Sequence, residues 1–280
     1  MTNIKKSIGE DAYKIIEIGR HLLSEPMAAK YKFSTEKELE EAFTKSSKVG
    51  NQLYWLEIFY RCHISSYSGL KRLLDWVAII EQSSDNFISY CSALRGLMEC
   101  AGDTYDGLSA AAITLGDNKS IIKEALRGEL ETTTVNKELE DTLIHFTHAS
   151  KTYAKVTGQS YHKPKQSQEY VKKLEEGTSI KFYEYYGFLC EFTHPAGASL
   201  GYNFDETANG ELIFNPSRDK QLVLDALIKD KSLIIEILMR GFNPIILLIK
   251  TINLFQVEGL YSKYADQIVL DVPAWKRIIK

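Results

Sequence analysis

The chain has 280 residues, of which 44% are hydrophobic and 25% are charged, so it can close a core without disulfides or metal. This balance excludes the disordered and fibrous classes of protein. With 34 basic and 37 acidic residues the net charge is −3, so the whole chain has no general attraction for nucleic acid or anionic lipid, and any basic surface must be local.

Helical spacing of apolar residues dominates the N-terminal third of the sequence. Isoleucines and leucines over 15–23 predict an amphipathic helix that ends near Pro26. Thr35, with Glu38 three residues later, is typical of a capping box and predicts the start of a second, highly charged helix. A long helix rich in aromatic residues is expected over 53–80, with a bend at Gly69.

The clearest amphipathic helix is expected to begin near Ser84 and Asp85, which can cap it, and to run towards Gly116. Its apolar residues follow steps of three and four and form one narrow stripe. They are Phe87, Tyr90, Leu94, Leu97, Met98, Ala101, Tyr105 and Leu108.

Residues 118–150 predict two more helices, the second beginning near Asn136, and a polar, basic connector follows over about 151–166. We expect this connector to be a mobile loop. After a short helix ending at Gly177, residues 182–194 carry aromatic or apolar side chains on nearly every face and end at Pro195. A helix that is apolar all round is expected at the centre of a bundle.

Residues 200–204 and 211–214 alternate around Asn209 and Gly210, which predicts a β-hairpin. A helix is expected from Ser217 to about Arg240, and another from Pro244. We therefore predict an all-α fold, a multi-helix bundle of roughly eight to ten helices with one small β-hairpin appendage at about 200–214. Residues 1–280 are expected to form a single helical domain.

The sequence indicates a cytoplasmic protein without a membrane partner. Its four cysteines are isolated and lie in helical patterns, which predicts neither a disulfide framework nor structural zinc. No apolar run of signal-peptide length stands near Met1. The most apolar stretch, 233–255, is interrupted by charged residues, glycine and proline, so we interpret it as core.

Arg95 and Glu99 are one helical turn apart, so they share one side of the helix that carries the apolar stripe. One interpretation is a solvated ion pair that contributes a few tenths of a kcal/mol, about 0.3 kcal/mol. The other is a guanidinium, held by the carboxylate, that orients a substrate phosphate or carboxylate.

His194 stands at the expected end of the aromatic helix, immediately before Pro195, where a side chain can face a cleft. It is a candidate for catalysis or ligand contact, and the alternative is a structural or capping role. Tyr186 lies two turns earlier on the same helix. The sequence contains no P-loop, no dinucleotide-binding glycine motif and no zinc-protease motif, which disfavours the common nucleotide and hydrolase sites.

The basic connector mixes lysines with tyrosine. Lys163, Lys165 and Tyr161 are the candidates for contact with a nucleic-acid backbone and a stacked base. The alternative is that these charges only keep a loop solvated.

Two motifs carry a resemblance to a known family. The helix Leu94-Arg95-Gly96-Leu97-Met98-Glu99 and the later segment from Tyr186 to Pro195 resemble a group of uncharacterised bacterial all-helical proteins. Those proteins share an R-x-x-x-E helix and a Y-x-x-L-[SC]-x-x-x-H-P helix, and the likeness covers roughly residues 50–200. The pairing of an Arg/Glu helix with a His-bearing helix is also distantly similar to the HEPN class of ribonucleases and defence proteins.

The resemblance implies RNA binding or metal-independent RNA cleavage, in bacterial stress or antiphage defence, with no cofactor and no metal site. His194 would transfer a proton, Arg95 would stabilise the phosphorane, Glu99 would orient Arg95 and Tyr186 would bind the phosphate. HEPN nucleases usually carry an arginine a few residues before the histidine on one helix, whereas here Arg95 would supply the cation from another helix. The alternative function is a non-enzymatic binding or assembly protein, joined to a protein partner or a second copy, in which Arg95, Glu99 and His194 are structural.

Overall fold

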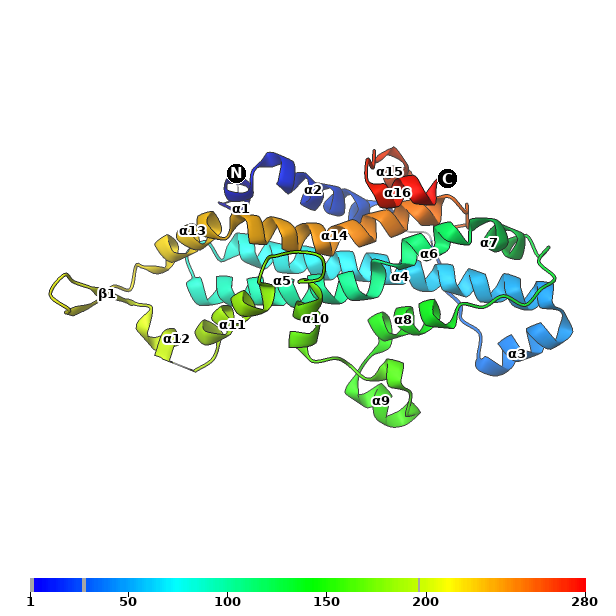
Figure 1. Cartoon of the computed structure of the whole chain (residues 1–280), viewed down its shortest axis with the longest axis horizontal. Coiled ribbons are helices and arrows are strands. Elements are labelled where there is room, and N and C mark those ends of the chain that lie inside the picture. Colours follow the sequence, from blue (N-terminus) through cyan, green and yellow to red (C-terminus); the bar gives the residue numbers. More distant parts are fainter. Residues whose placement is uncertain (1–2, 27–28, 196) are drawn as a thin grey trace. The chain divides into compact units, whose positions relative to one another are not determined.

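The computed structural model describes residues 3–26, 29–195 and 197–280, and these residues form an all-α protein with one antiparallel β-hairpin (Figure 1). The predicted fold class is confirmed. The helical segments are more numerous than expected, because several of the predicted helices are divided and short helices occupy expected loops.

The chain divides into two compact units. Unit 1 comprises Met1–Arg20, Lys71–Tyr105 and Gln166–Phe242, and unit 2 comprises His21–Leu70, Asp106–Lys165 and Asn243–Lys280. Four helices contribute residues to both units, namely α2 (Glu10–Ser24), α4 (Ser47–Gln82), α5 (Phe87–Leu108) and α14 (Lys231–Asn253). The single domain expected from the sequence stays a prediction.

The remaining elements belong to one unit each. Unit 1 contains α1 (Asn3–Ile8), α10 (Ser167–Lys173), α11 (Phe182–Thr193), α12 (Gly197–Gly201), β1 (Phe204–Glu206), β2 (Leu212–Phe214) and α13 (Asp219–Lys229). Unit 2 contains α3 (Glu36–Lys45), α6 (Ala111–Asp117), α7 (Lys119–Leu126), α8 (Lys137–His148), α9 (Lys151–Thr157), the 3₁₀ turn η1 (Ser160–His162), α15 (Lys263–Gln267) and α16 (Pro273–Ile278).

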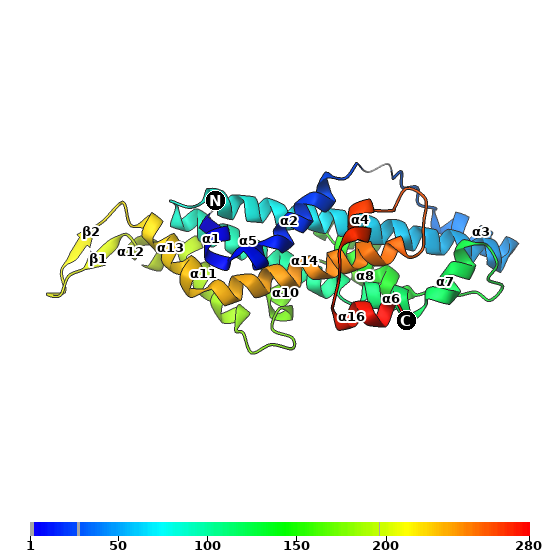
Figure 2. The same cartoon turned by 90° about the horizontal axis from the view of Figure 1, so that it is seen from above.

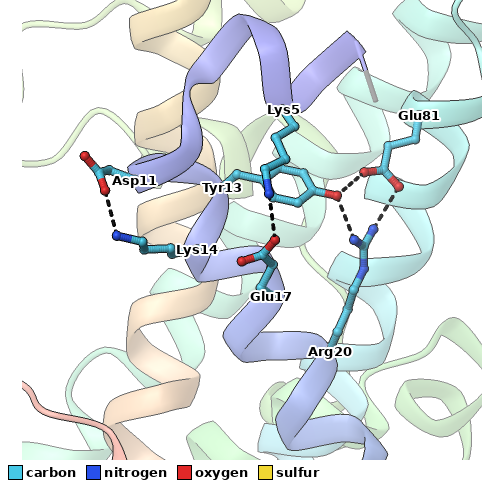
Figure 3. Close-up of polar contacts among 7 residues, drawn as sticks. All are labelled: Lys5, Asp11, Tyr13, Lys14, Glu17, Arg20 and Glu81. Carbon is cyan, nitrogen blue, oxygen red and sulfur yellow. Dashed lines mark hydrogen bonds and ion pairs between the residues drawn. The ribbon is translucent and has the colours of Figure 1, made fainter. Parts of the chain in front are cut away.

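In unit 1, polar contacts join α2 to α4 (Figure 3). The Tyr13 hydroxyl donates to Glu81 Oε1 at 2.6 Å, and Arg20 Nη1 donates to the same hydroxyl at 2.7 Å. Arg20 Nη2 lies 2.8 Å from Glu81 Oε2 and closes the triad. Because the Tyr13 side chain is otherwise buried, this triad fixes the position of α2 on α4.

The predicted stripe on α5 faces the core. All of its residues are buried except Tyr105, which is half-buried. The helix starts later than predicted, because Asn86 Oδ1 accepts the Ser89 N–H at 2.8 Å and thereby caps it. It also ends at Leu108 instead of near Gly116, which belongs to α6.

The parts of α4, α5 and α14 that belong to unit 1 lie side by side in both views (Figure 1, Figure 2). In unit 1 a Cβ on Gly241 would lie 3.0 Å from Leu73 and 3.2 Å from Ala101, so the glycine lets α14 approach both neighbours closely. Likewise, a Cβ on Gly96 would lie 2.6 Å from the Trp76 ring, and only glycine leaves room for that ring against α5.

The predicted boundary at Arg240 and Pro244 is wrong. Asp230 separates α13 from α14, and α14 continues through Pro244. Proline lacks the N–H that the Arg240 carbonyl would accept, but burial of the apolar residues on both sides keeps the helix continuous. These buried residues include Ile234, Ile237, Leu238, Phe242, Ile245, Ile246, Leu248, Ile249 and Ile252.

By length and composition α14 could cross a membrane, and it is the one helix of the described residues that meets this test. Just over half of its most apolar window, 56%, is buried inside the protein. The absence of a membrane partner stays a prediction.

The prediction that the aromatic helix lies at the centre of a bundle is wrong. Helix α11 has the expected bounds, yet only Phe182 and Leu189 are buried on it, and Phe188 is 44% exposed. Its apolar residues extend around the helix because one side contacts α5 while another carries an aromatic cluster that is open to solvent. Periodicity alone does not separate these two environments.

The hairpin is confirmed, but its first strand begins later than predicted. Strands β1 and β2 pair with Phe204 opposite Phe214 and Glu206 opposite Leu212, whereas residues 197–201 form α12. Tyr202, which was expected in the strand, instead contacts Phe87 at 5.7 Å between ring centroids. The hairpin extends away from the helices of its own unit, and residues 212–214 are exposed (Figure 2).

In unit 2, the capping box of Thr35 and Glu38 begins α3 as predicted. Helix α8 begins next to Asn136, as predicted, and the Asn136 side chain caps it. The connector over 151–166 is not a continuous loop, because it contains α9 and η1. The Ser150 side chain accepts the Tyr153 N–H at 3.0 Å and so caps the start of α9. The basic composition of this segment favoured a loop, and the cap at Ser150 was therefore not predicted.

Candidate functional site

Helices α5 and α11 bring four of the predicted site residues together in unit 1. Arg95 faces Thr193, and Glu99 faces Tyr186. Since the residue number rises along α5 while that of the partner falls along α11, the two helices run antiparallel where they touch. The spacing of four on α5 and of seven on α11 places each pair of side chains on one side of its helix.

Arg95 contacts three other residues of this cluster. Its Nη1 donates to Thr193 Oγ1 at 2.9 Å and lies 3.5 Å from His194 Nε2, and its Nε lies 3.6 Å from Glu99 Oε1. The side chains of Arg95 and Glu99 are 29% and 28% exposed, so the pair is more shielded than a surface ion pair. The guanidinium is thus held from two helices and remains in contact with water.

Tyr186 contacts Glu99 in this structure, and its hydrogen bond to a phosphate stays a prediction. Its hydroxyl donates to Glu99 Oε1 at 2.6 Å, so the proton expected to bind a phosphate is already engaged. Burial, followed by this hydrogen bond to Glu99, raises the pKa of the Tyr186 hydroxyl above its usual range. Tyr186 therefore positions the carboxylate in this structure.

His194 is the C-cap residue of α11, and its backbone N–H donates to the Cys190 carbonyl at 3.0 Å. Its side chain is exposed, as the position before Pro195 suggested. Because a guanidinium has only donors, the contact with Arg95 requires Nε2 to accept, which places the ring proton on Nδ1. The lone pair of His194 Nε2 therefore faces the Arg95 guanidinium.

Sequence reasoning missed Thr193, which contacts Arg95 from the last turn of α11. Its hydroxyl lies 3.3 Å from the Cys190 carbonyl, to which it donates while accepting from Arg95. The seven-residue spacing from Tyr186 was the available signal, since it places both side chains on the same side of α11.

The three candidates of the basic connector belong to unit 2. Lys165 forms an ion pair with Asp106, and the Tyr161 carbonyl lies 2.9 Å from His145 Nδ1. Lys163 is exposed. The structure thus joins Arg95, Glu99, Tyr186 and His194 into one cluster, and nucleic-acid contact by the connector stays a prediction.

Comparison of the chain with known protein families, with curated proteins and with solved structures finds no match. Within the described ranges, no three His, Cys, Asp or Glu side chains gather as they would to hold a metal ion.

Proposed function

We propose that the Arg95–His194 cluster binds a phosphodiester of RNA and promotes its cleavage without a metal ion, as the resemblance to HEPN nucleases implies. The observation that carries this proposal is the 3.5 Å separation of Arg95 Nη1 and His194 Nε2 at a water-exposed helix end. A cation that stabilises phosphoryl oxygens and a base that accepts a proton are the two groups that this reaction needs.

One cleavage moves protons between the ribose, His194 and the leaving oxygen. Once Arg95 Nη1 donates to a phosphoryl oxygen instead of to His194 Nε2, that nitrogen takes the proton of the ribose 2′-hydroxyl as the oxygen forms a bond to phosphorus. The bond from phosphorus to the 5′-oxygen breaks, and the leaving oxygen takes a proton from the imidazolium or from water. The products are a cyclic phosphate and a 5′-hydroxyl, and Arg95 stabilises the negative charge that grows on the phosphoryl oxygens.

The neighbours of Arg95 support this role by fixing the guanidinium. Glu99 and Thr193 contact Nε and Nη1, and Tyr186 in turn holds Glu99. A guanidinium that is already oriented loses less side-chain entropy when it binds a phosphate. Glu99, Thr193 and Tyr186 are therefore positioning residues, and Arg95 and His194 are the groups that touch the substrate.

A second function is favoured by the same hydrogen bonds. The contacts from Tyr186 to Glu99 and from Arg95 to Thr193 join α5 to α11 whether or not RNA is bound. In this alternative the cluster locks two helices of a non-enzymatic binding or assembly protein. Arg95→Ala would then lower the melting temperature by a few degrees, roughly 2–4 °C, because Glu99 and Thr193 lose their partner.

The experiment that tests the proposal is incubation of the purified protein with total RNA in the presence of a chelator. His194→Ala should slow cleavage by about 10²- to 10⁴-fold, the usual contribution of a positioned acid or base. His21→Ala replaces another exposed histidine and should leave the rate unchanged. Identical RNA profiles for the wild type and His194→Ala would contradict the proposed cleavage.

A stability measurement separates the two functions. Because the His194 side chain is exposed, His194→Ala should melt with the wild type even though it has lost cleavage. If Arg95→Ala and His194→Ala change no RNA product while Arg95→Ala melts earlier, the structural function is the correct one.

A further inference from the structure

Unit 1 contains an apolar cavity of about 370 Å³. One of its lining residues, Phe192, directly precedes Thr193 and His194 of the Arg95 cluster in the sequence. Helix α11 supplies two of its lining residues, and the rest come from the start of α5, from the segment 198–202 and from α13 and the turn before it. The lining residues are Phe87, Phe188, Phe192, Ala198, Gly201, Tyr202, Arg218 and Leu222.

The rings that line this cavity meet edge to face. Phe192 lies 5.1 Å from Phe87 and 5.0 Å from Phe188 between centroids, at interplanar angles of 75° and 71°. Phe192 also meets Tyr202 at 6.3 Å and 81°. Edge-to-face pairs leave ring faces available for a further flat group, and the exposed part of Phe188, 44% of that residue, is open to such a group.

The size of the cavity restricts the occupant. Its volume lies at the small end of the range for ligand sites, about 300–1,000 Å³, which suits one compact ring system better than an extended chain. The lining residues include four aromatic residues and one arginine, Arg218, but no acidic residue. This is the chemistry with which proteins stack unpaired bases.

The position of Phe192 argues for a nucleobase over an apolar peptide side chain. Phe192 directly precedes Thr193 and His194, so one short segment of α11 contributes both to the aromatic cavity and to the Arg95 cluster. A nucleotide carries a flat base and a phosphate on a single unit, and it can therefore use both. An apolar side chain of a peptide would use only the cavity.

We propose that this aromatic cavity stacks one splayed-out base of single-stranded RNA while the neighbouring phosphate lies at Arg95 and His194. The proposal rests on the function proposed above and names its substrate class, because a base held inside a duplex cannot enter such a cavity.

Arg218 closes one side of the cavity and is held there by two contacts. It donates to the Phe204 carbonyl, and its Nε lies 3.3 Å from Asp205 Oδ1. These contacts fix the side chain of Arg218, which is one of the residues that line the cavity. The start of the hairpin therefore holds one of the residues that line the base site.

The first experiment tests the cavity without RNA cleavage. The protein is labelled with fluorinated phenylalanine and titrated with adenosine 5′-monophosphate into the millimolar range, the affinity expected for stacking of one base. The signals of Phe188 and Phe192 should shift, and that of Phe255 in unit 2 should not. Unchanged Phe188 and Phe192 signals overturn the proposal, whatever RNA does.

The second experiment measures the affinity of a short single-stranded RNA by fluorescence anisotropy. Phe188→Ala should weaken binding by about tenfold, and Phe188→Trp should restore it. Tyr183→Ala is the matched control, because Tyr183 is the other largely exposed aromatic residue of α11 and does not line the cavity. Equal affinities of Phe188→Ala and wild type also overturn the proposal.

The two experiments separate failure of the base site from failure of the proposed function. If the monophosphate shifts the cavity signals but the wild type binds no RNA, the base site stands and the RNA function is wrong. If Arg95→Ala abolishes RNA binding while Phe188→Ala does not alter it, the RNA function stands and the base site is wrong.

Discussion

Histidine 63 makes the stability of unit 2 depend on pH. The residue lies on α4 and is only 2% exposed. Its Nδ1 is 2.6 Å from the Tyr31 hydroxyl, and its ring centroid is 4.5 Å from the ring centroid of Tyr67. Burial lowers the pKa of His63 from 6.5 to about 4, because the charged imidazolium is poorly solvated there. Glu25 and Lys263 line the cavity beside it.

The sign of the effect follows from the lowered pKa. Between pH 6.5 and pH 4 the unfolded chain binds a proton at this residue and the folded chain does not, so acid favours unfolding. The full stability is present above pH 6.5 and is lost as the pH falls towards 4. A difference of about 2.5 pKa units is worth about 3 kcal/mol, and about 2 kcal/mol of it is lost by pH 5.

The assay is urea unfolding of the wild type and of His63→Gln at several pH values from about 7.5 to 4.5. Glutamine keeps a polar group near Tyr31 but does not titrate, so the variant should be less stable than the wild type at neutral pH and should lose less stability on acidification. The difference between the two should shrink by about 2 kcal/mol from pH 7 to pH 5.

His21→Gln serves as the control, since His21 is exposed, and its unfolding free energy should follow that of the wild type throughout. Parallel pH curves for the wild type and His63→Gln would refute the reasoning, because His63 would then titrate alike in the folded and unfolded chains.

Three substitutions, each within one unit, test local contacts by their effect on the free energy of unfolding. Gly102→Ala should destabilise by about 2 kcal/mol, because the new Cβ would meet the Tyr170 carbonyl oxygen; a neutral result would contradict that close contact. Asn51→Leu should destabilise by about 3 kcal/mol, because this buried amide bonds three backbone groups of residues 130–134, including the Thr134 N–H at 2.9 Å, and a loss below 1 kcal/mol would contradict this role. Gln256→Gly should stabilise by about 1 kcal/mol in urea unfolding, because its φ of 52° is a left-handed conformation, and any destabilisation would show that the side chain matters more.

Local signals predicted the elements that depend on neighbouring residues. The stripe on α5, the capping box at Thr35 and the helix start near Asn136 depend on interactions within a few residues, so the sequence alone located them. The continuation of α14 through Pro244 depends instead on burial against distant segments, which outweighs the local preference of proline.

The cluster at α5 and α11 was partly accessible to the same reasoning. The spacing of Arg95 and Glu99 predicted one shared side, and helical geometry supports it. The approach of the two helices came from a resemblance to other proteins and not from spacing. The donation from Tyr186 to Glu99 could not be predicted, because it depends on the antiparallel alignment of helices separated by about ninety residues.

The hairpin has a consequence for handling the protein. Two strands make an isolated sheet with two unpaired edges, and Leu212, Ile213 and Phe214 of β2 are 67%, 55% and 60% exposed. Open edges with apolar side chains are templates for additional strands, so concentrated solutions should lose material to aggregation that starts at this ribbon. A lysine in place of Ile213 should raise the solubility limit while leaving the helices folded.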